Sequence, residues 1–190
     1  MLSTHLTFFA CWVVYYALHS FLALDAVKDR VPLSRQAYRL LYSLISIVLL
    51  IFVLLLGAVQ DTFFVVAPSS TTMSFAGAFT IVGVFLVKRA FRNYSFRGFL
   101  GVKKEPAELK TDGIQGRMRH PLYTGTILIV MGYCSFNPNM INVVSLLSLL
   151  LYLPFGIYLE EKKLIRQFGQ AYLDYRQEVP ALFPRIFKPG

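Results

Sequence analysis

Residues 122–159 read LYTGTILIVMGYCSFNPNMINVVSLLSLLLYLPFGIYL, and this stretch decides the fold. It contains two apolar runs, Leu122–Phe136 and Ile141–Leu159, separated by a turn-forming Asn-Pro-Asn sequence at 137–139. A helix needs about 20 apolar residues to cross a bilayer, so the second run is long enough and the first is short. The stretch therefore predicts an antiparallel hairpin of membrane helices.

Three more apolar runs precede this hairpin: Leu6–Leu24, Ala37–Val59 and Met73–Val87. The chain has 190 residues, of which 56% are hydrophobic and 15% charged, and this composition excludes an ordinary soluble domain. No Lys or Arg and no small-residue cleavage site accompany Leu6–Leu24, so we expect a retained span and not a signal peptide. Met73–Val87 is short, like the first run of the hairpin, and either one can be tilted, broken or re-entrant. The expected fold is all-α, a polytopic membrane bundle of about five transmembrane helices.

The positive charges define the expected topology. All 19 Lys and Arg fall in three segments, Lys28–Arg39, Lys88–Arg119 and Lys162–Lys188. Five spans place these segments on one face, which the positive-inside rule makes cytoplasmic, with the N-terminus outside and the C-terminus inside. The net charge of +9 is therefore explained by topology and by contact with anionic lipid headgroups. We expect membrane lipids as partners, and no nucleic acid.

The chain is expected to form a single integral membrane domain over residues 1–190, with the N-terminal spans in 1–100. Residues 101–190 hold a polar loop, the hairpin and a C-terminal helix. The loop contains Pro106 and the turn-forming Gly113 and Gly116, and such loops present backbone N–H and C=O groups to a ligand. Beyond Leu159, apolar residues recur every fourth position through Tyr172, and this predicts that the helix continues as far as Tyr175.

Lys88–Phe99 follows the third span and is both basic and aromatic. As an extension of that span it would lie along the inner membrane surface. Two interpretations stay open: the segment anchors the protein at the interface, or it forms a lid or a substrate entrance over a site.

A cluster of polar residues is expected at the inner end of the hairpin. The hairpin brings His120, at the start of span four, to the level of Glu160, at the end of span five. Pro121 biases His120 toward extended backbone, and the imidazole can donate from one nitrogen and accept at the other. Charged groups at the end of a span are costly to bury, which indicates a functional site. Taken alone, His120 can be a capping residue and Arg119 a headgroup anchor.

Glu160 and Glu161 point about 100° apart on a helix, so one of them can face inward. Glu160 directly follows the apolar run and is the one expected to bind a cation, an amine or ribose hydroxyls. For Glu161 the simpler expectation is a local ion pair with Lys163 or Arg166.

Three motifs occur together in the C-terminal part of the chain. RHPLYTG spans Arg119–Gly125, EEKKLIRQFG spans Glu160–Gly169, and Tyr172, Tyr175 and Val179–Pro180 follow. In this order the motifs resemble the isoprenylcysteine carboxyl methyltransferase superfamily of integral membrane methyltransferases, over roughly Leu109–Pro184. The resemblance implies an S-adenosylmethionine-dependent membrane methyltransferase that holds the cofactor on the cytosolic side and releases S-adenosylhomocysteine.

The resemblance also implies roles for single residues. By this resemblance, His120 and Arg119 would be catalytic. His120 and Tyr123 would also bind the methionine or ribose part of the cofactor, while Glu160 would bind the polar groups of the cofactor. Matched residue by residue, the cofactor contacts of the family fall on Ala107, Glu108, Leu109, Lys110, Gln115, His120, Pro121, Leu122, Tyr123 and Glu160.

The sequence departs from the family in ways that bear on the methyl acceptor. Gly156 stands where enzymes that methylate a prenylcysteine carboxylate carry an Arg, and Gln115 stands where an aromatic residue is usual. A small thiol, or another neutral or lipophilic acceptor, fits the absence of the Arg better than a carboxylate does.

The N-terminal half resembles the branch that contains methanethiol S-methyltransferases, through His19-Ser20 and the run Tyr38–Tyr42. By this resemblance His19, Arg39 and Tyr123 would line the acceptor site. Alternatively, His19 is a satisfied histidine within a span and Arg39 anchors the protein to headgroups.

Two other functions stay open at this point. One is an NADPH-dependent membrane reductase of the sterol reductase type, which would be expected to have more spans. The other is a non-enzymatic membrane protein, either a scaffold or a transporter component. Cys11 and Cys134 lack the spacing of metal ligands, so no metal is expected. The compact five-span organisation suits a bacterial inner membrane, with the site facing the cytoplasm.

Overall fold

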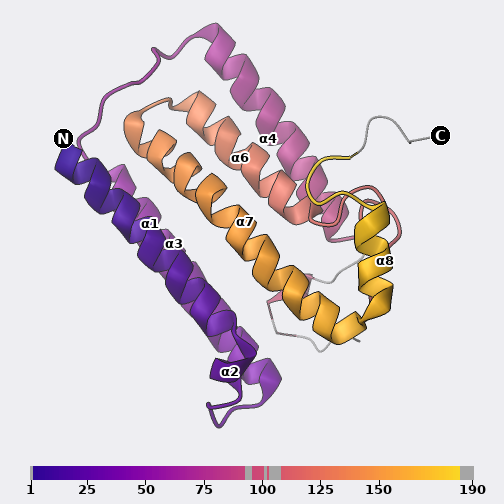
Figure 1. Ribbon diagram of the computed structural model, residues 1–190. Coiled ribbons are helices and arrows are strands. Elements are labelled where there is room, and N and C mark those ends of the chain that lie inside the picture. The colour runs from indigo at the N-terminus through magenta and orange to yellow at the C-terminus, as the bar shows by residue number, and fades with distance from the viewer. Residues whose placement is uncertain (1, 93–95, 101, 103–107, 185–190) are drawn as a thin grey trace.

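A computed structural model of the chain shows a bundle of long, roughly antiparallel helices (Figure 1). The structure describes residues 2–92, 96–100, 102 and 108–184. Within these ranges it contains eight helices and no strand: α1 (Leu2–Ala23), α2 (Asp25–Lys28), α3 (Arg35–Ala58), α4 (Ser70–Ala90), α5 (Phe96–Phe99), α6 (Pro121–Phe136), α7 (Met140–Phe168) and α8 (Gln170–Glu178).

Four helices, α1, α3, α4 and α7, are long and apolar enough to cross a membrane in the described part of the chain, and α6 is a shorter apolar helix of 16 residues. These helices confirm the all-α, polytopic membrane class. With 21 residues, α4 is longer than the apolar run Met73–Val87, because a capping box starts it early. Ser69 Oγ accepts from the Thr72 amide at 3.2 Å, and Thr72 Oγ1 accepts from the Ser69 amide at 2.9 Å.

In the bundle, α7 lies between α1 and α6, while α4 covers the far side of α6 and α3 packs on α1 (Figure 1). Small residues allow α4 and α6 to approach closely. A Cβ added to Gly83 would lie 2.8 Å from the Gly125 carbonyl oxygen, and one added to Gly125 would lie 2.9 Å from that of Gly83. These two helices therefore pack backbone against backbone and form one wall of the bundle.

A separate apolar core joins α1, α3 and α7. It consists of Phe8, Trp12, Val53, Ile141 and Val144, all buried. The Trp12 indole also donates a hydrogen bond to Ser145 Oγ on α7, at 3.2 Å. This core fixes α1 against the helix that carries the two glutamates.

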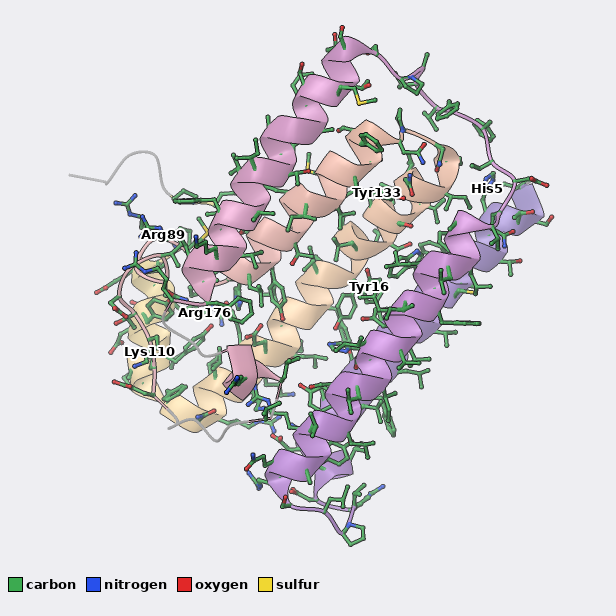
Figure 2. The ribbon with its side chains drawn as sticks, turned by 180° about the vertical axis from the view of Figure 1, so that it is seen from behind. His5, Tyr16, Arg89, Lys110, Tyr133 and Arg176 are labelled. Carbon is green, nitrogen blue, oxygen red and sulfur yellow. The ribbon has the colours of Figure 1, made fainter. Side chains whose placement is uncertain are left out.

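The loops gather at two opposite ends of the bundle. At one end, the connection before α4 meets the turn before α7, where the Val65 amide donates to the Pro138 carbonyl at 2.9 Å. At the other end lie α2, the polar loop 108–120 and α8. Figure 2 shows Arg89, Lys110 and Arg176 at this second end. The described parts of the three basic segments thus share one end, as the five-span arrangement requires.

Two local expectations are wrong. The helix that follows the fifth span does not continue to Tyr175, because Gly169 adopts φ +57°, a conformation that favours glycine, and α8 turns away from α7 there (Figure 1). Lys88–Phe99 is not an unbroken extension of the third span either. The helix α4 ends at Ala90, Phe91 and Arg92 form a turn, and α5 is a separate short helix. Residues 93–95 lie outside the described residues, and the lid stays a prediction.

Candidate functional site

The hairpin brings His120 and Glu160 together, as expected. His120 is the N-cap of α6, directly before Pro121, and is 5% exposed. Its Nδ1 lies 3.5 Å from Glu160 Oε2, and its Nε2 lies 3.2 Å from Glu161 Oε1. One imidazole thus faces both carboxylates at the end of α7.

Glu161, and not Glu160, is the buried member of the pair. Arg119 contacts Glu161 Oε1 through Nη2 at 2.7 Å and Nε at 2.9 Å, while Arg176 Nε lies 3.3 Å from Oε2. The side chains of Arg119 and Glu161 are 9% and 8% exposed. The expectation of a local pair with Lys163 or Arg166 is therefore wrong: the helical phase of α7 turns Glu161 toward the start of α6 and toward α8.

The segment Val179–Leu182, here called the C-terminal strap, crosses the start of α6. The amides of Arg119 and His120 donate to the carbonyls of Pro180 and Ala181, both at 2.9 Å. Thr124 Oγ1 donates to the Leu182 carbonyl at 2.7 Å, and Arg119 Nη1 donates to the Val179 carbonyl. The strap satisfies backbone donors that a helix start otherwise leaves unpaired. The sequence marked Val179–Pro180 as part of a motif but did not show where the segment lies, because the strap bonds through its backbone carbonyls.

The charges around His120 determine its protonation. Burial alone lowers the pKa of His120, but the hydrogen bond and negative charge of Glu160, followed by those of Glu161, outweigh it. The pKa of His120 is consequently raised above its usual value of 6.5. The two carboxylates therefore favour the protonated imidazole, which donates hydrogen bonds to them.

Tyr123 and Glu160 form the open side of this cluster. The ring of Tyr123 stacks on that of His120, with centroids 5.4 Å apart and planes 21° apart. The hydroxyl of Tyr123 donates a hydrogen bond to the Glu160 carboxylate. The Glu160 side chain is 43% exposed, whereas that of Glu161 is 8% exposed. Pro121 is buried beneath the cluster and Leu122 is half-buried beside it.

The polar loop passes close to α8. Leu109 packs on the apolar cluster of Tyr172, Tyr175 and Val179, while the neighbouring Glu108 and Lys110 form an ion pair. Ala107, expected to contact a cofactor, lies outside the described residues.

Gln115 ties this loop to two helices. Its buried side chain donates to the Ala90 carbonyl at the end of α4, at 3.3 Å, and its own carbonyl accepts from the Tyr175 hydroxyl at 2.7 Å.

Tyr172 is a motif residue whose buried hydroxyl the sequence did not single out. It is 1% exposed, and its hydroxyl has no hydrogen-bond partner among the described residues. Burial raises its pKa, and the negative charge of Glu161 adds to this effect. In the sequence, Tyr172 is one more residue of an apolar stripe, and only the structure places its hydroxyl near the charged cluster.

Of the three residues expected to line an acceptor site, His19 lies on α1, Arg39 on α3 and Tyr123 on α6. His19 Nδ1 is 3.0 Å from Ser46 Oγ, so the histidine is satisfied within the spans, and its ring lies 6.4 Å from that of Tyr42. Arg39 is exposed near the start of α3, where its charge acts on Lys163. The described residues contain no group of three His, Cys, Asp or Glu that could hold a metal ion.

Comparison with known proteins assigns the chain to a family. The model of the NnrU protein family matches residues 7–182, which include every helix from α2 to α8 and most of α1. The chain belongs to the NnrU family.

Curated relatives of this NnrU-family chain are named as methyltransferases. It is 30% identical to methanethiol S-methyltransferase 2 of Bradyrhizobium diazoefficiens over 49% of the chain, and 34% identical to methanethiol S-methyltransferase of Crocosphaera subtropica over 44%. It is 38% identical to protein-S-isoprenylcysteine O-methyltransferase of Schizosaccharomyces pombe over 41% of the chain. These matches confirm the resemblance noted in the sequence.

The matches are partial. They span 35%, 32% and 34% of the three relatives, about a third of each. No solved structure matches the chain significantly.

Proposed function

We propose that this integral membrane protein is an S-adenosylmethionine-dependent methyltransferase that acts on a small or lipophilic acceptor, a thiol or a carboxylate. The observation that carries the proposal is the cluster of His120, Tyr123 and Glu160 at one end of the hairpin, with the unpaired hydroxyl of Tyr172 nearby. The names of the relatives support a methyltransferase. We place this end at the cytoplasmic side of a bacterial inner membrane, because the basic segments gather there.

The residues present fit such a cofactor. The half-exposed carboxylate of Glu160 is suited to accept hydrogen bonds from ribose hydroxyls or from an amino group. The buried hydroxyl of Tyr172 lacks a partner, and an unpaired buried hydroxyl is costly unless something polar binds it. Stacked on His120, Tyr123 supplies an aromatic face. The backbone of Glu108, Leu109 and Lys110 would border the cofactor, as would Gln115, Pro121 and Leu122.

When bound, S-adenosylmethionine supplies a methyl group that is already activated, so the chain has to position the reactants and exclude water. The pairing of Arg119 with Glu161 holds His120 in place, and His120 in turn faces Glu160. A thiol acceptor would have to lose its proton to bulk water before methyl transfer, whereas a carboxylate acceptor is already ionised at neutral pH.

Binding of S-adenosylhomocysteine to detergent-purified protein, measured by calorimetry, tests the proposal. We expect saturable binding that is at least about tenfold weaker in Glu160→Ala, because hydrogen bonds to a charged group contribute roughly 1.5–3 kcal/mol. Glu178→Ala is the matched control, since Glu178 is an exposed residue of α8. Wild-type protein that is folded and binds NADPH, but not S-adenosylhomocysteine, would move the function to a reductase. Equal affinity in both variants would remove Glu160 from the site.

A further inference from the structure

A group of hydroxylated side chains lies between α1 and α7, inside two membrane-spanning helices. Tyr16 and Tyr152 stack face to face, with centroids 4.2 Å apart and planes 7° apart. The Tyr152 hydroxyl is 2.8 Å from Ser20 Oγ. We call Tyr16, Ser20 and Tyr152 the tyrosine platform. Figure 2 shows Tyr16 on the side of α1 that faces α7. Polar groups within a span are costly and usually serve a function.

The platform depends on a glycine one turn further along α7. A Cβ added to Gly156 would lie 3.1 Å from Cε1 of Tyr152 and 3.3 Å from its hydroxyl oxygen. Contacts this short are rare for real side chains, so the ring occupies the space that a side chain at position 156 would need. Tyr152 and Gly156 therefore act as one unit, because a Cβ at 156 would press on the ring of Tyr152 and the ring would have to give way.

The platform borders the candidate cofactor site. Tyr152 and Glu160 lie on the same helix, α7, with Tyr152 about two turns before Glu160. Tyr123, which stacks on His120 and bonds Glu160, lies at the end of α7 that this helix reaches after the platform. An acceptor that enters from the bilayer, and approaches a methyl group held near Tyr123 and Glu160, would contact the platform on its way.

The charges in this region discriminate between acceptors. The sequence has no Lys or Arg before Lys28 and none between Arg119 and Lys162, so α1, α6 and the spanning part of α7 bring no cation. A carboxylate with a pKa of about 4 is ionised at neutral pH, and the spanning parts of these three helices offer it no cation. A thiol with a pKa of about 8.5 enters uncharged.

We propose that Tyr152, lying over Gly156 and stacked on Tyr16, is the wall of the acceptor site and restricts it to small acceptors that enter uncharged, namely short-chain thiols. This inference rests on the proposed function. The thiol loses its proton to water, its sulfur bonds the methyl carbon, and the electron pair of the broken carbon–sulfur bond remains on the donor sulfur. Tyr152 forms no bond in this step, and its role is to exclude longer chains.

The experiment compares methanethiol with 1-octanethiol as acceptors for wild-type protein and Tyr152→Ala. Removing the ring opens the wall, and we expect the ratio of kcat/KM for 1-octanethiol to that for methanethiol to rise about tenfold or more. Tyr158→Ala is the matched control, because Tyr158 is an exposed aromatic of the same helix that contacts Lys162. We expect that variant to keep the wild-type ratio.

A second readout needs no turnover. Trp12 is the only tryptophan and stacks on Tyr16, with centroids 5.5 Å apart, so its fluorescence reports on the platform. Adding 1-octanethiol to protein saturated with S-adenosylhomocysteine should change Trp12 emission in Tyr152→Ala at concentrations about tenfold lower than in wild type. Gly156→Ala should alter the emission without ligand, while Gly77→Ala should not, since nothing lies within 4 Å of a Cβ at Gly77.

The outcomes separate this inference from the proposed function. If the wild-type protein binds no S-adenosylhomocysteine, the proposed function itself is contradicted. If wild type and Tyr152→Ala bind it equally, an unchanged thiol ratio overturns the role of Tyr152. Wild-type protein that binds S-adenosylhomocysteine but methylates a lipophilic carboxylate, and no thiol, overturns the acceptor class.

Discussion

Arg119 Nη2 lies 2.7 Å from Glu161 Oε1, although the two residues are 42 positions apart, and both side chains are almost fully buried. The same oxygen lies 3.2 Å from His120 Nε2, and the other carboxylate oxygen faces Arg176. One carboxylate thus joins the start of α6, the end of α7 and α8. The open carboxylate of Glu160 is positioned by this buried neighbour.

Replacing Glu161 by alanine should lower the free energy of unfolding by about 3–5 kcal/mol, because it leaves buried positive charge without a partner. The measurement is thermal or denaturant unfolding of the protein in detergent. Glu178→Ala, on the exposed face of α8, should leave unfolding unchanged within about 0.5 kcal/mol. A Glu161→Ala protein as stable as the control would show that the ion cluster contributes little.

The raised pKa of His120 predicts how stability depends on pH. A group whose pKa is higher in the folded state binds its proton more tightly there, so its contribution is complete below the unfolded value of 6.5. That contribution is lost as pH rises through the raised folded pKa. We expect the melting temperature to fall as pH increases above 6.5, and this fall to be smaller in His120→Gln. An equal pH dependence in both proteins would assign the effect to other groups.

Tyr172 and Tyr175 offer a matched pair of hydroxyl deletions. Tyr172→Phe removes a hydroxyl without a partner among the described residues, so the unliganded protein should gain about 1–3 kcal/mol in stability. Its affinity for S-adenosylhomocysteine should nevertheless fall, because the cofactor would lose that hydroxyl.

Tyr175→Phe should instead lower stability, by about 1 kcal/mol, because it removes the hydrogen bond from the Tyr175 hydroxyl to the Gln115 carbonyl. Unfolding and calorimetric titration of both variants test the pair. Lower stability in Tyr172→Phe would indicate that its hydroxyl is already satisfied in the unliganded protein.

The backbone contact between α4 and α6 is sensitive to a single methyl group. Gly83→Ala places a Cβ 2.8 Å from the Gly125 carbonyl oxygen, and we expect it to cost about 1–3 kcal/mol in unfolding free energy. Gly77→Ala, on the same helix, has open space around the new Cβ and should be neutral or slightly stabilising. Equal stability of the two variants would mean that the helices separate without penalty.

Much of the fold was predictable from the sequence, because the length of an apolar run determines whether a helix spans a bilayer. The turn of the hairpin was equally clear from the sequence, and it predicts that His120 lies beside Glu160, as the structure shows. The end of α4 and the bend at Gly169 were missed. An apolar stripe continues across a glycine whether or not the backbone turns there.

The internal arrangement of the site was harder to predict from the sequence. Adjacent glutamates differ only by about 100° of helical phase, and the sequence did not show that Glu161 is the one that α6 and α8 enclose. The unpaired hydroxyl of Tyr172 and the ring of Tyr152 over Gly156 arise from packing between distant segments. Such contacts between distant segments leave no periodic pattern in the sequence.

The C-terminal strap has a consequence for how the protein is made. The amides of Arg119 and His120 are satisfied by the carbonyls of Pro180 and Ala181, which the ribosome adds much later. The two helices of the hairpin can enter the membrane while the head of α6 still lacks these partners. Synthesis runs from the N-terminus, so the site matures only after insertion, when the last segment folds back. A chain that is truncated before residue 179 and released from the ribosome would therefore keep both helices of the hairpin, yet lack the carbonyl partners at the head of α6.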